Sequence, residues 1–373
     1  HYIYFFTTVS SSEQRIVRMT DSNDIGTAQT TIVSGLPTRG GNHDGGGIGI
    51  GRDGKLYWAI GDNGNAVGVD ADLTSLGSKV GRSGLNGEVL VDNPFYDGAG
   101  PNNDYIWARG FRNPFTLTFN PATGDLWVNV TGDNYEQVFL VRKGDHAGWN
   151  DYQNNQPAGY IPPIIKYRTH GSDNRSVAAN GASRMNNVVT FTTTATNGFR
   201  QGEKITIAGV SDSSFNGAFY VASTLNATNF TVSQTGANAT SGNGSATTAV
   251  LGDALTGGCF YDGTGFPAAY RGNFFFCDFT SDRIMRAVLD QDTNVLSVDF
   301  FANNIDRVVD ITTGPDGALY YAANGGTIYR AAYQNASQSI VLQPAYLSLP
   351  EGGETVFTVR LATAPAANVT VTI

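Results

Sequence analysis

The chain has few basic residues and no long apolar run, and each absence removes a class of partner. Among 373 residues, 23 are Lys or Arg and 32 are Asp or Glu, which gives a net charge of −9, and the basic residues form no cluster. Nucleic acid and anionic membrane surfaces are therefore not expected as partners. Apolar stretches stay far below the roughly 18 residues of a membrane-spanning helix, so no membrane span is expected.

Cysteine is also scarce. Cys259 and Cys277 are the two in the chain, within CFYDG and FFFCDF. These segments are predicted to be neighbouring antiparallel strands, which is compatible with a disulfide and equally with two buried thiols. The low Lys content and the many Asn, Thr and Ser residues are typical of an exported bacterial protein, so we expect a periplasmic, secreted or cell-surface location.

Glycine and aromatic residues are abundant, with 46 Gly, 17 Tyr and 21 Phe, and no stretch has the 3.6-residue period of an amphipathic helix. A repeated unit joins a strand, an Asp-Gly or Thr-Gly turn and a second, aromatic strand. Such hairpins cannot bury their apolar face alone, and the repeat favours an all-β propeller over an ordinary β-sandwich. The unit recurs at residues 47–62, 116–133 and 310–325, with a variant at 266–290.

Two segments interrupt the repeat. Residues 184–250 carry almost no charge and alternate Thr or Val with apolar residues, which predicts a small β-barrel-like module inserted in a propeller loop. The tail, 337–373, is similar to the opening strands of a Calx-beta sandwich. The predicted multidomain organisation is propeller at 1–183 and 251–336, with the inserted module and the partial sandwich as spacer or adhesion elements.

One histidine lies in the glycine-rich stretch GGNHDGGG. Nineteen residues after His43, Asp62 ends the strand LYWAIGD. If the two stretches pair across a hairpin, the carboxylate can fix the tautomer of an imidazole that acts as a general base. A turn histidine bonded to a turn aspartate, with no catalytic role, is the alternative.

Two further stretches carry polar groups at strand ends. Arg112 and Asn113 precede a strand in GFRNP, where a guanidinium can face a carboxylate or quinone oxygen or form an ion pair between blades. The turn TGDN, followed by Glu136, offers carbonyl and carboxylate oxygens suited to Ca²⁺, or is a polar hairpin turn.

The order of these motifs resembles one family. The chain resembles the soluble PQQ-dependent glucose/sorbosone (aldose sugar) dehydrogenases, which are six-bladed β-propellers. The resemblance rests on the order of His43 and Asp62, GFRNP (110–114), TGDLW (123–127) and KGDHAGWN (143–150). The resemblance covers about residues 1–175 and 251–334 and omits the insert and the tail. It implies oxidation of aldose sugars to lactones, with hydride transfer from sugar C1 to PQQ and an external electron acceptor.

The resemblance also implies roles for individual residues. His43 matches the general base, Asp62 the carboxylate that orients it, and Arg112 the arginine beside the reactive quinone carbonyl. Asn113 matches a cofactor contact, and Arg283 and Arg286 are expected to meet PQQ carboxylates.

Calcium sites follow from the same resemblance. Gly132 and Asp133 fall where backbone carbonyls hold the Ca²⁺ that bridges to PQQ, and Glu136 falls where a second, structural Ca²⁺ draws a carboxylate. Two departures from the family pattern are Phe115, where the glucose dehydrogenases carry Gln, and Ala147, where an aromatic residue is usual.

The N-terminal blade of the six is expected to be missing or incomplete in this chain, with another domain or chain completing the ring. Because Hedgehog-interacting protein keeps such a propeller without sugar oxidation, a non-catalytic propeller that serves as a binding or adhesion module of a multidomain extracellular protein is the alternative function.

Overall fold

The computed structural model describes residues 1–333 apart from 40, 65, 66 and 101, together with 340–343, 352, 356 and 358–361. The described residues form β-strands and short 3₁₀ turns, without an α-helix among them, so the all-β prediction is confirmed. The chain divides into two compact units, His1–Ala331 and Ala332–Ile373. In the described part, no helix has the length and apolar character needed to cross a membrane.

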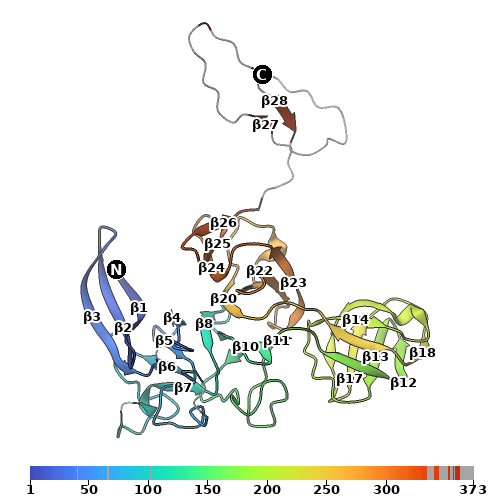
Figure 1. The fold of residues 1–373 in the computed structure, drawn as a ribbon, viewed down its shortest axis with the longest axis horizontal. Helices are drawn as coiled ribbons and strands as arrows, with labels where there is room; N and C mark the ends of the chain where they lie inside the picture. Colours follow the sequence, from blue (N-terminus) through green and yellow to red (C-terminus); the bar gives the residue numbers. More distant parts are fainter. Residues whose placement is uncertain are drawn as a thin grey trace. The chain divides into compact units, whose positions relative to one another are not determined.

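Five small antiparallel sheets make up most of the first unit (Figure 1). Within each sheet every strand pairs with the next along the chain, as in propeller blades. The sheets are β1 (Tyr2–Ser10), β2 (Glu13–Ser22) and β3 (Ile25–Leu36); β4 (Ile48–Ile50), β5 (Leu56–Ile60), β6 (Lys79–Ser83) and β7 (Ile106–Arg109); β8 (Pro114–Phe119), β9 (Leu126–Val130), β10 (Tyr135–Val141) and β11 (Ile165–Arg168); β20 (Leu255–Phe260), β21 (Phe274–Asp278), β22 (Arg283–Leu289) and β23 (Val295–Asn303); and β24 (Val308–Thr313), β25 (Leu319–Ala323) and β26 (Ile328–Ala331). The 3₁₀ turns are η1 (Asn103–Tyr105), η2 (Ser213–Phe215) and η3 (Ala268–Tyr270).

The turns predicted from the repeated unit form the hairpins of these sheets. Gly54, Gly124, Gly272 and Gly317 lie in the turns before β5, β9, β21 and β25, with φ between +69° and +82°. Only glycine adopts such angles freely, which explains why each turn ends in this residue.

The first strands of the sheets pack side by side in the order β1, β4, β8, β20 and β24, which is a propeller-like arrangement. Side chains join neighbouring sheets through backbone carbonyls: the Thr116 hydroxyl donates to the Thr256 carbonyl at 2.9 Å, and the Thr256 hydroxyl donates to the Val308 carbonyl at 2.7 Å. A cavity of about 220 Å³ between these strands is lined in part by Gly46, Cys259 and Asp310. It lies where a propeller has its central channel.

Aromatic side chains fill the space between sheets. Trp127 of β9 is fully buried against Phe260 and Phe274, with ring centroids 4.9 and 4.8 Å apart. All five residues of β21 are buried. A strand covered on both faces loses the alternation of apolar and polar residues, which accounts for the continuous run FFFC.

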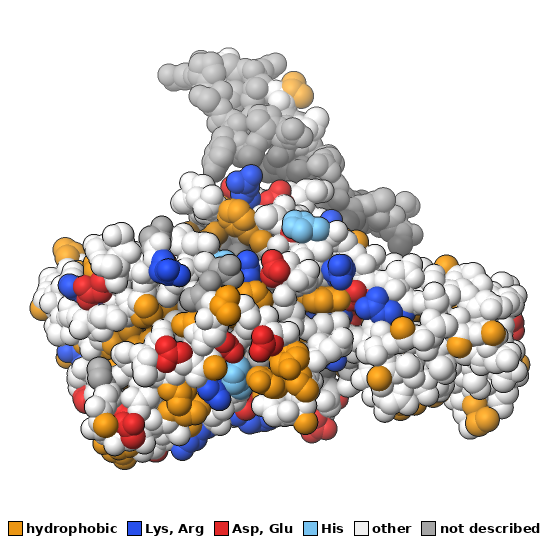
Figure 2. Space-filling view, turned by 60° about the horizontal axis from the view of Figure 1, so that its bottom comes forward, with side chains coloured by type: hydrophobic (Ala, Val, Ile, Leu, Met, Phe, Trp, Pro, Cys, Tyr) orange, Lys and Arg blue, Asp and Glu red, His pale blue; other side chains and the backbone are white. Residues whose placement is uncertain are grey.

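The inserted module is a curled eight-stranded sheet with its own core. In that core Phe191 stacks on Phe230, and Phe199 contacts Phe230 edge to face. The first strand of this sheet begins at Asn174. The expected start of the insert, residue 184, was based on the change in composition there. Few charged side chains cover this sheet at the right of Figure 2, in contrast with the propeller surface. Its strands are β12 (Asn174–Met185), β13 (Val188–Thr193), β14 (Lys204–Ala208), β15 (Gly217–Tyr220), β16 (Ser223–Thr224), β17 (Asn229–Ser233), β18 (Ala239–Ser241) and β19 (Ser245–Thr248).

In the second unit, β27 (Ile340–Gln343) and β28 (Thr358–Leu361) form an antiparallel pair. The rest of the expected Calx-beta sandwich lies outside the described residues.

The two cysteines are buried and free, so of the two alternatives left open by their spacing the structure has the thiols. Both belong to the apolar cluster that joins the fourth and fifth sheets. Burial raises the pKa of both thiols above its ordinary value, which keeps them protonated and unreactive.

Candidate active site

A histidine–aspartate pair lies where the first strands of the second and third sheets begin. His43 Nδ1 is 2.6 Å from Asp62 Oδ1, and the side chains are 14% and 1% exposed. Gly61 permits this contact, because a Cβ there would lie 2.4 Å from the His43 carbonyl oxygen. A carboxylate can only accept, so the imidazole donates from Nδ1, and in the neutral ring this places the lone pair on Nε2. Such a ring can accept a proton.

Trp149 fixes the other oxygen of the same carboxylate. Its indole Nε1 donates to Asp62 Oδ2 at 2.8 Å, and the backbone N–H of Gly64 donates to Oδ1 at 2.9 Å. A buried carboxylate held by several donors keeps its orientation. Trp149 therefore positions Asp62, which in turn positions His43. The sequence interpretation did not include this residue, although the GW pair of the resemblance contains it.

Arg112 joins the same cluster through its backbone and its side chain. Its carbonyl accepts from the Asp62 N–H at 2.7 Å. Its guanidinium lies 5.6 Å from the Trp149 ring centroid and donates to the carbonyls of Gly132 at 2.7 Å and Thr131 at 3.2 Å. The structure thus brings together the three residues expected to carry catalysis.

The neighbouring Asn113 enters through its backbone, since its carbonyl accepts from the Thr131 N–H at 2.9 Å. The residue is half-buried.

The predicted calcium ligands lie in the adjoining turn, in two different environments. The Gly132 carbonyl is bonded to Arg112, and the exposed Asp133 carboxylate accepts from Asn134 Nδ2 at 3.2 Å. Glu136 is fully buried: its Oε2 accepts from the Leu255 N–H at 2.8 Å, while Oε1 has no hydrogen-bond partner among the described residues. Within that same part of the chain, no three His, Cys, Asp or Glu residues cluster as a metal site.

Burial raises the pKa of Glu136 to about 8, and the nearby Asp278 carboxylate adds to the shift. The carboxyl group therefore favours either a bound proton or a nearby cation.

Arg283 and Arg286 do not share partners with this cluster. Arg283 donates to the Leu251 carbonyl at 2.9 Å and lies over the Phe300 ring, where the inserted sheet leads back into the propeller. Arg286 lies over the Tyr270 ring at 3.9 Å and donates to the Ala269 carbonyl. Their assignment to PQQ carboxylates stays a prediction.

The glycine run after His43 brings neighbouring strands close together. A Cβ on Gly45 would lie 2.5 Å from the Ala59 carbonyl oxygen, and one on Gly46 would lie 2.9 Å from that of Phe115. Protein backbone thus occupies these positions, while Gly46 and Gly47 also line the central cavity. The run is needed for strand packing whether or not a ligand approaches it.

A second histidine, His146, lies in the loop that carries Trp149. Its Nδ1 accepts from the Gly148 N–H at 3.0 Å, and its Nε2 is 3.6 Å from Asp70 Oδ2. Burial, followed by the charges of Arg109 and Lys79, lowers the pKa of His146 to about 4. The ring is therefore neutral near pH 7, and its contacts hold the loop in place.

Comparisons with known proteins give the following matches. The sequence matches the family described as Glucose / Sorbosone dehydrogenase over residues 1–180 and 226–330. It is 36% identical over 110 residues to the aldose sugar dehydrogenase YliI of Escherichia coli, which is 29% of each chain. It is 31% identical over 137 residues to quinoprotein glucose dehydrogenase B of Acinetobacter calcoaceticus, covering 32% of this chain and 28% of that protein. The aligned stretches thus span less than a third of these curated relatives.

Among solved structures, the PQQ-bound aldose sugar dehydrogenase of Streptomyces coelicolor is similar in fold, with a TM-score of 0.53 and 18% identity. The likeness covers 88% of this chain and 74% of that one.

Proposed function

Because the chain belongs to the glucose/sorbosone dehydrogenase family, we propose that it is a PQQ-dependent oxidoreductase that converts aldose sugars to lactones. The observation that carries this proposal is the connected set of His43, Asp62, Trp149 and Arg112. A base with a fixed tautomer and a guanidinium are the groups needed to remove a hydroxyl proton and to stabilise negative charge on an oxygen.

In this proposal the Nε2 of His43 accepts the proton of the C1 hydroxyl of the sugar. The imidazolium that forms is stabilised by the Asp62 carboxylate at 2.6 Å. Trp149 keeps that carboxylate from rotating toward another donor. The two oxygens of Asp62 thus perform different tasks, one toward the base and one toward the scaffold.

PQQ, when bound, supplies the acceptor for the hydride from C1. The groups beside His43 suit a flat, anionic quinone, since Arg112 offers a guanidinium and Trp149 an aromatic face. Asn113, the next residue after Arg112, would add its amide. Arg112 and Asn113 would hold the cofactor. Arg283 and Arg286 would contribute only if their present contacts change.

Calcium fits one of its two expected positions better than the other. The buried, unpaired Oε1 of Glu136 suits a cation, because a bound charge would satisfy the oxygen and offset the cost of burying the carboxylate. At Gly132 the carbonyl already accepts from Arg112. A cation held there by Gly132 and Asp133 would have to share that oxygen with the guanidinium.

The six-bladed form, an exported location and an external electron acceptor belong to the same proposal. The first strands of the five sheets pack in order from β1 to β24, which supports a propeller whose sixth blade would lie between β1 and β24. Another domain or chain would supply it.

The test is reconstitution with PQQ and Ca²⁺, followed by dye reduction with several aldoses. We expect turnover by the wild type and a loss of about 10²- to 10⁴-fold in kcat for His43→Ala, the range attributed to a general base. PQQ binding, measured by its absorbance, should survive the substitution. A wild-type chain that binds PQQ without oxidising any aldose, or a His43→Ala variant with full kcat, would contradict the proposal.

A further inference from the structure

A polar groove of about 500 Å³ lies at the junction of the propeller and the inserted sheet. One wall is the propeller segment from Asn154 to Pro162. The other two are loops of the insert, around Thr196–Arg200 and Thr224–Ala227. Residues 181–225 lie outside the family match, so most of the insert's contribution is not part of the matched family pattern.

The lining of the groove has the chemistry of a site for neutral, hydroxyl-rich ligands. It includes the side-chain amides of Asn154, Asn155, Gln156, Asn197 and Asn226, and no carboxylate. The absence of acidic groups is notable in a chain with a net charge of −9. Amides both donate and accept, so they match hydroxyl groups, which do the same. Asn197 and Asn226 already use side-chain atoms in bonds within the loops of the insert, so the amides available to a ligand are those of Asn154, Asn155 and Gln156.

Several polar atoms of the lining lack partners. The Asn154 Oδ1, Gln156 Oε1 and Arg200 Nε atoms are shielded from solvent without a hydrogen bond to any described residue. A buried polar atom without a partner is costly, and the final torsion of an amide side chain turns easily. Rotation of the Asn154 amide would present its oxygen to a ligand in the groove, whereas the same rotation of Gln156 would also break its Nε2 hydrogen bond to the Ala147 carbonyl at 3.5 Å.

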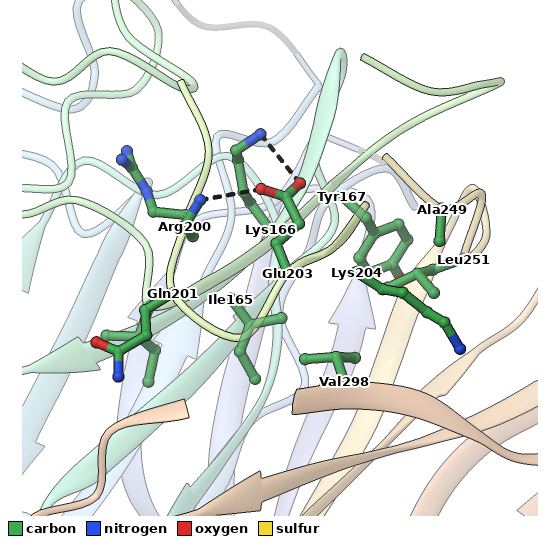
Figure 3. Close-up of a pocket in the computed structure, with 11 residues that line it drawn as sticks. Ile165, Lys166, Tyr167, Arg200, Gln201, Glu203, Lys204, Ala249, Leu251 and Val298 are labelled. Atoms are coloured by element: carbon green, nitrogen blue, oxygen red, sulfur yellow. Dashed lines mark hydrogen bonds and ion pairs between the residues drawn. The ribbon is translucent and has the colours of Figure 1, made fainter. Parts of the chain in front are cut away.

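The groove has walls that are fixed to each other. Lys166 of β11 is fully buried and lies 3.2 Å from Asp173 and 3.5 Å from Glu203, which precede β12 and β14 of the insert. Arg200 donates to the Asn154 carbonyl at 2.7 Å and thereby joins two walls directly. Figure 3 shows Lys166 and the Arg200 backbone directed toward the same Glu203 carboxylate. Buried ion pairs of this kind hold the insert in one position.

The groove is continuous along the chain with the candidate active site. Trp149, which holds Asp62, is five residues before Asn154, a span of at most about 18 Å. Between them, Gln153 accepts from the backbone N–H groups of Asp133 and Asn134. The groove and the candidate active site thus lie on one loop, within this span of each other along the backbone.

We propose that this groove is an accessory subsite for neutral oligosaccharides, whose reducing end lies in the candidate active site. The inference rests on the proposed function, and it narrows the substrate class from free aldoses to the ends of neutral glycan chains. The insert, in this interpretation, is part of the substrate-binding surface.

The test measures binding without turnover. Calorimetry on the full chain without PQQ would use maltopentaose and cellopentaose reduced to their alditols, which lack the C1 hemiacetal that is converted to a lactone, with glucitol as the single-unit comparison. We expect at least one pentaose alditol to bind roughly ten times more tightly than glucitol, or tighter still, because the longer ligand adds several hydrogen bonds. Dye reduction by the PQQ-loaded chain is measured separately.

Two substitutions locate the binding. Asn155 and Thr224 are exposed in the groove and make no side-chain hydrogen bond within the described part of the chain. The double variant Asn155→Ala/Thr224→Ala should weaken pentaose binding by roughly thirtyfold, the typical effect of two hydrogen bonds. Thr240→Ala, at an exposed position on β18 outside the groove, is the matched control and should bind as the wild type does.

Pentaose binding no tighter than that of glucitol would overturn the inference, and so would equal weakening in the double variant and the control. Turnover of aldoses without pentaose binding would remove the subsite and leave the proposed function. Tight binding lost in the double variant, in a chain that oxidises no aldose, would remove the proposed function and leave a glycan-binding groove.

Discussion

Replacing Trp149 by Phe should disable the base without unfolding the protein. The change keeps an aromatic ring beside the Arg112 guanidinium but removes the N–H that donates to Asp62 Oδ2 at 2.8 Å. Asp62 is 1% exposed, so water cannot easily replace that donor. A hydrogen bond to a charged group contributes about 1.5–3 kcal/mol, which corresponds to roughly 10- to 150-fold. Most of it should appear as a loss in kcat/KM, because Asp62 is needed most when His43 is protonated.

The assay is dye reduction by the PQQ-loaded protein at saturating cofactor, with the Tm measured on the same samples. Trp127→Phe is the matched control, because the Trp127 indole is also buried but its N–H has no partner within the described chain. The control should lower Tm while leaving kcat/KM within about threefold, as expected for loss of packing alone. An unchanged kcat/KM in Trp149→Phe, or an equal fall in both variants, would refute the positioning role of Trp149.

Three further predictions concern stability and reactivity. Burial lowers the pKa of His146 to about 4 from the ordinary 6.5, so between these pH values the unfolded state binds more protons than the folded state. The free energy of unfolding, measured by urea titration, should therefore fall by up to about 3 kcal/mol as the pH drops from 6.5 to 4, and His146→Asn should lack this component. Added Ca²⁺ should raise the Tm of the wild type, by an amount equivalent to about 2.7 kcal/mol at 100 times its Kd, and should not raise that of Glu136→Gln; equal shifts would place the cation elsewhere. A thiol reagent should modify neither Cys259 nor Cys277 in the native protein and both after unfolding without reductant, whereas an absence of reaction after unfolding would reveal a disulfide.

Local signals in the sequence were sufficient for the hairpins. An Asp-Gly or Thr-Gly turn between two apolar runs specifies strand, turn and strand within about fifteen residues, and Gly54, Gly124 and Gly317 adopt the positive φ that such turns require. The His43–Asp62 contact could be anticipated in the same way, since β5 ends at Ile60 beside the strand that follows His43. Both depend on pairing between segments close in sequence.

Contacts between distant segments could not be predicted so readily. Trp149 is 87 residues from Asp62, and a tryptophan in a glycine-containing loop gives no local indication of its partner. The arginines of β22 show a different limit. Arg283 and Arg286 are three residues apart on β22, which pairs with β21 in unbroken register over this stretch. Their side chains therefore point to opposite faces of the sheet. That alternation alone makes it difficult for both to meet one ligand.

The catalytic and cofactor-binding parts of the proposed site therefore differ in how they are built. The His43 and Arg112 carbonyls both approach Gly61, which has no side chain to keep them apart, and Trp149 closes the cluster from a third segment. Packing of the second and third sheets thus orients the base before any ligand arrives, which is the preorganisation that electrostatic catalysis requires. The cofactor contacts are not preorganised in the same way. Among the described residues, Arg112 is the one predicted PQQ-binding arginine in this cluster, and its guanidinium is bonded to the Gly132 carbonyl. The orientation of the base should consequently be robust to changes in the fourth sheet, while PQQ affinity should depend on how far Arg112 can exchange that bond for the cofactor.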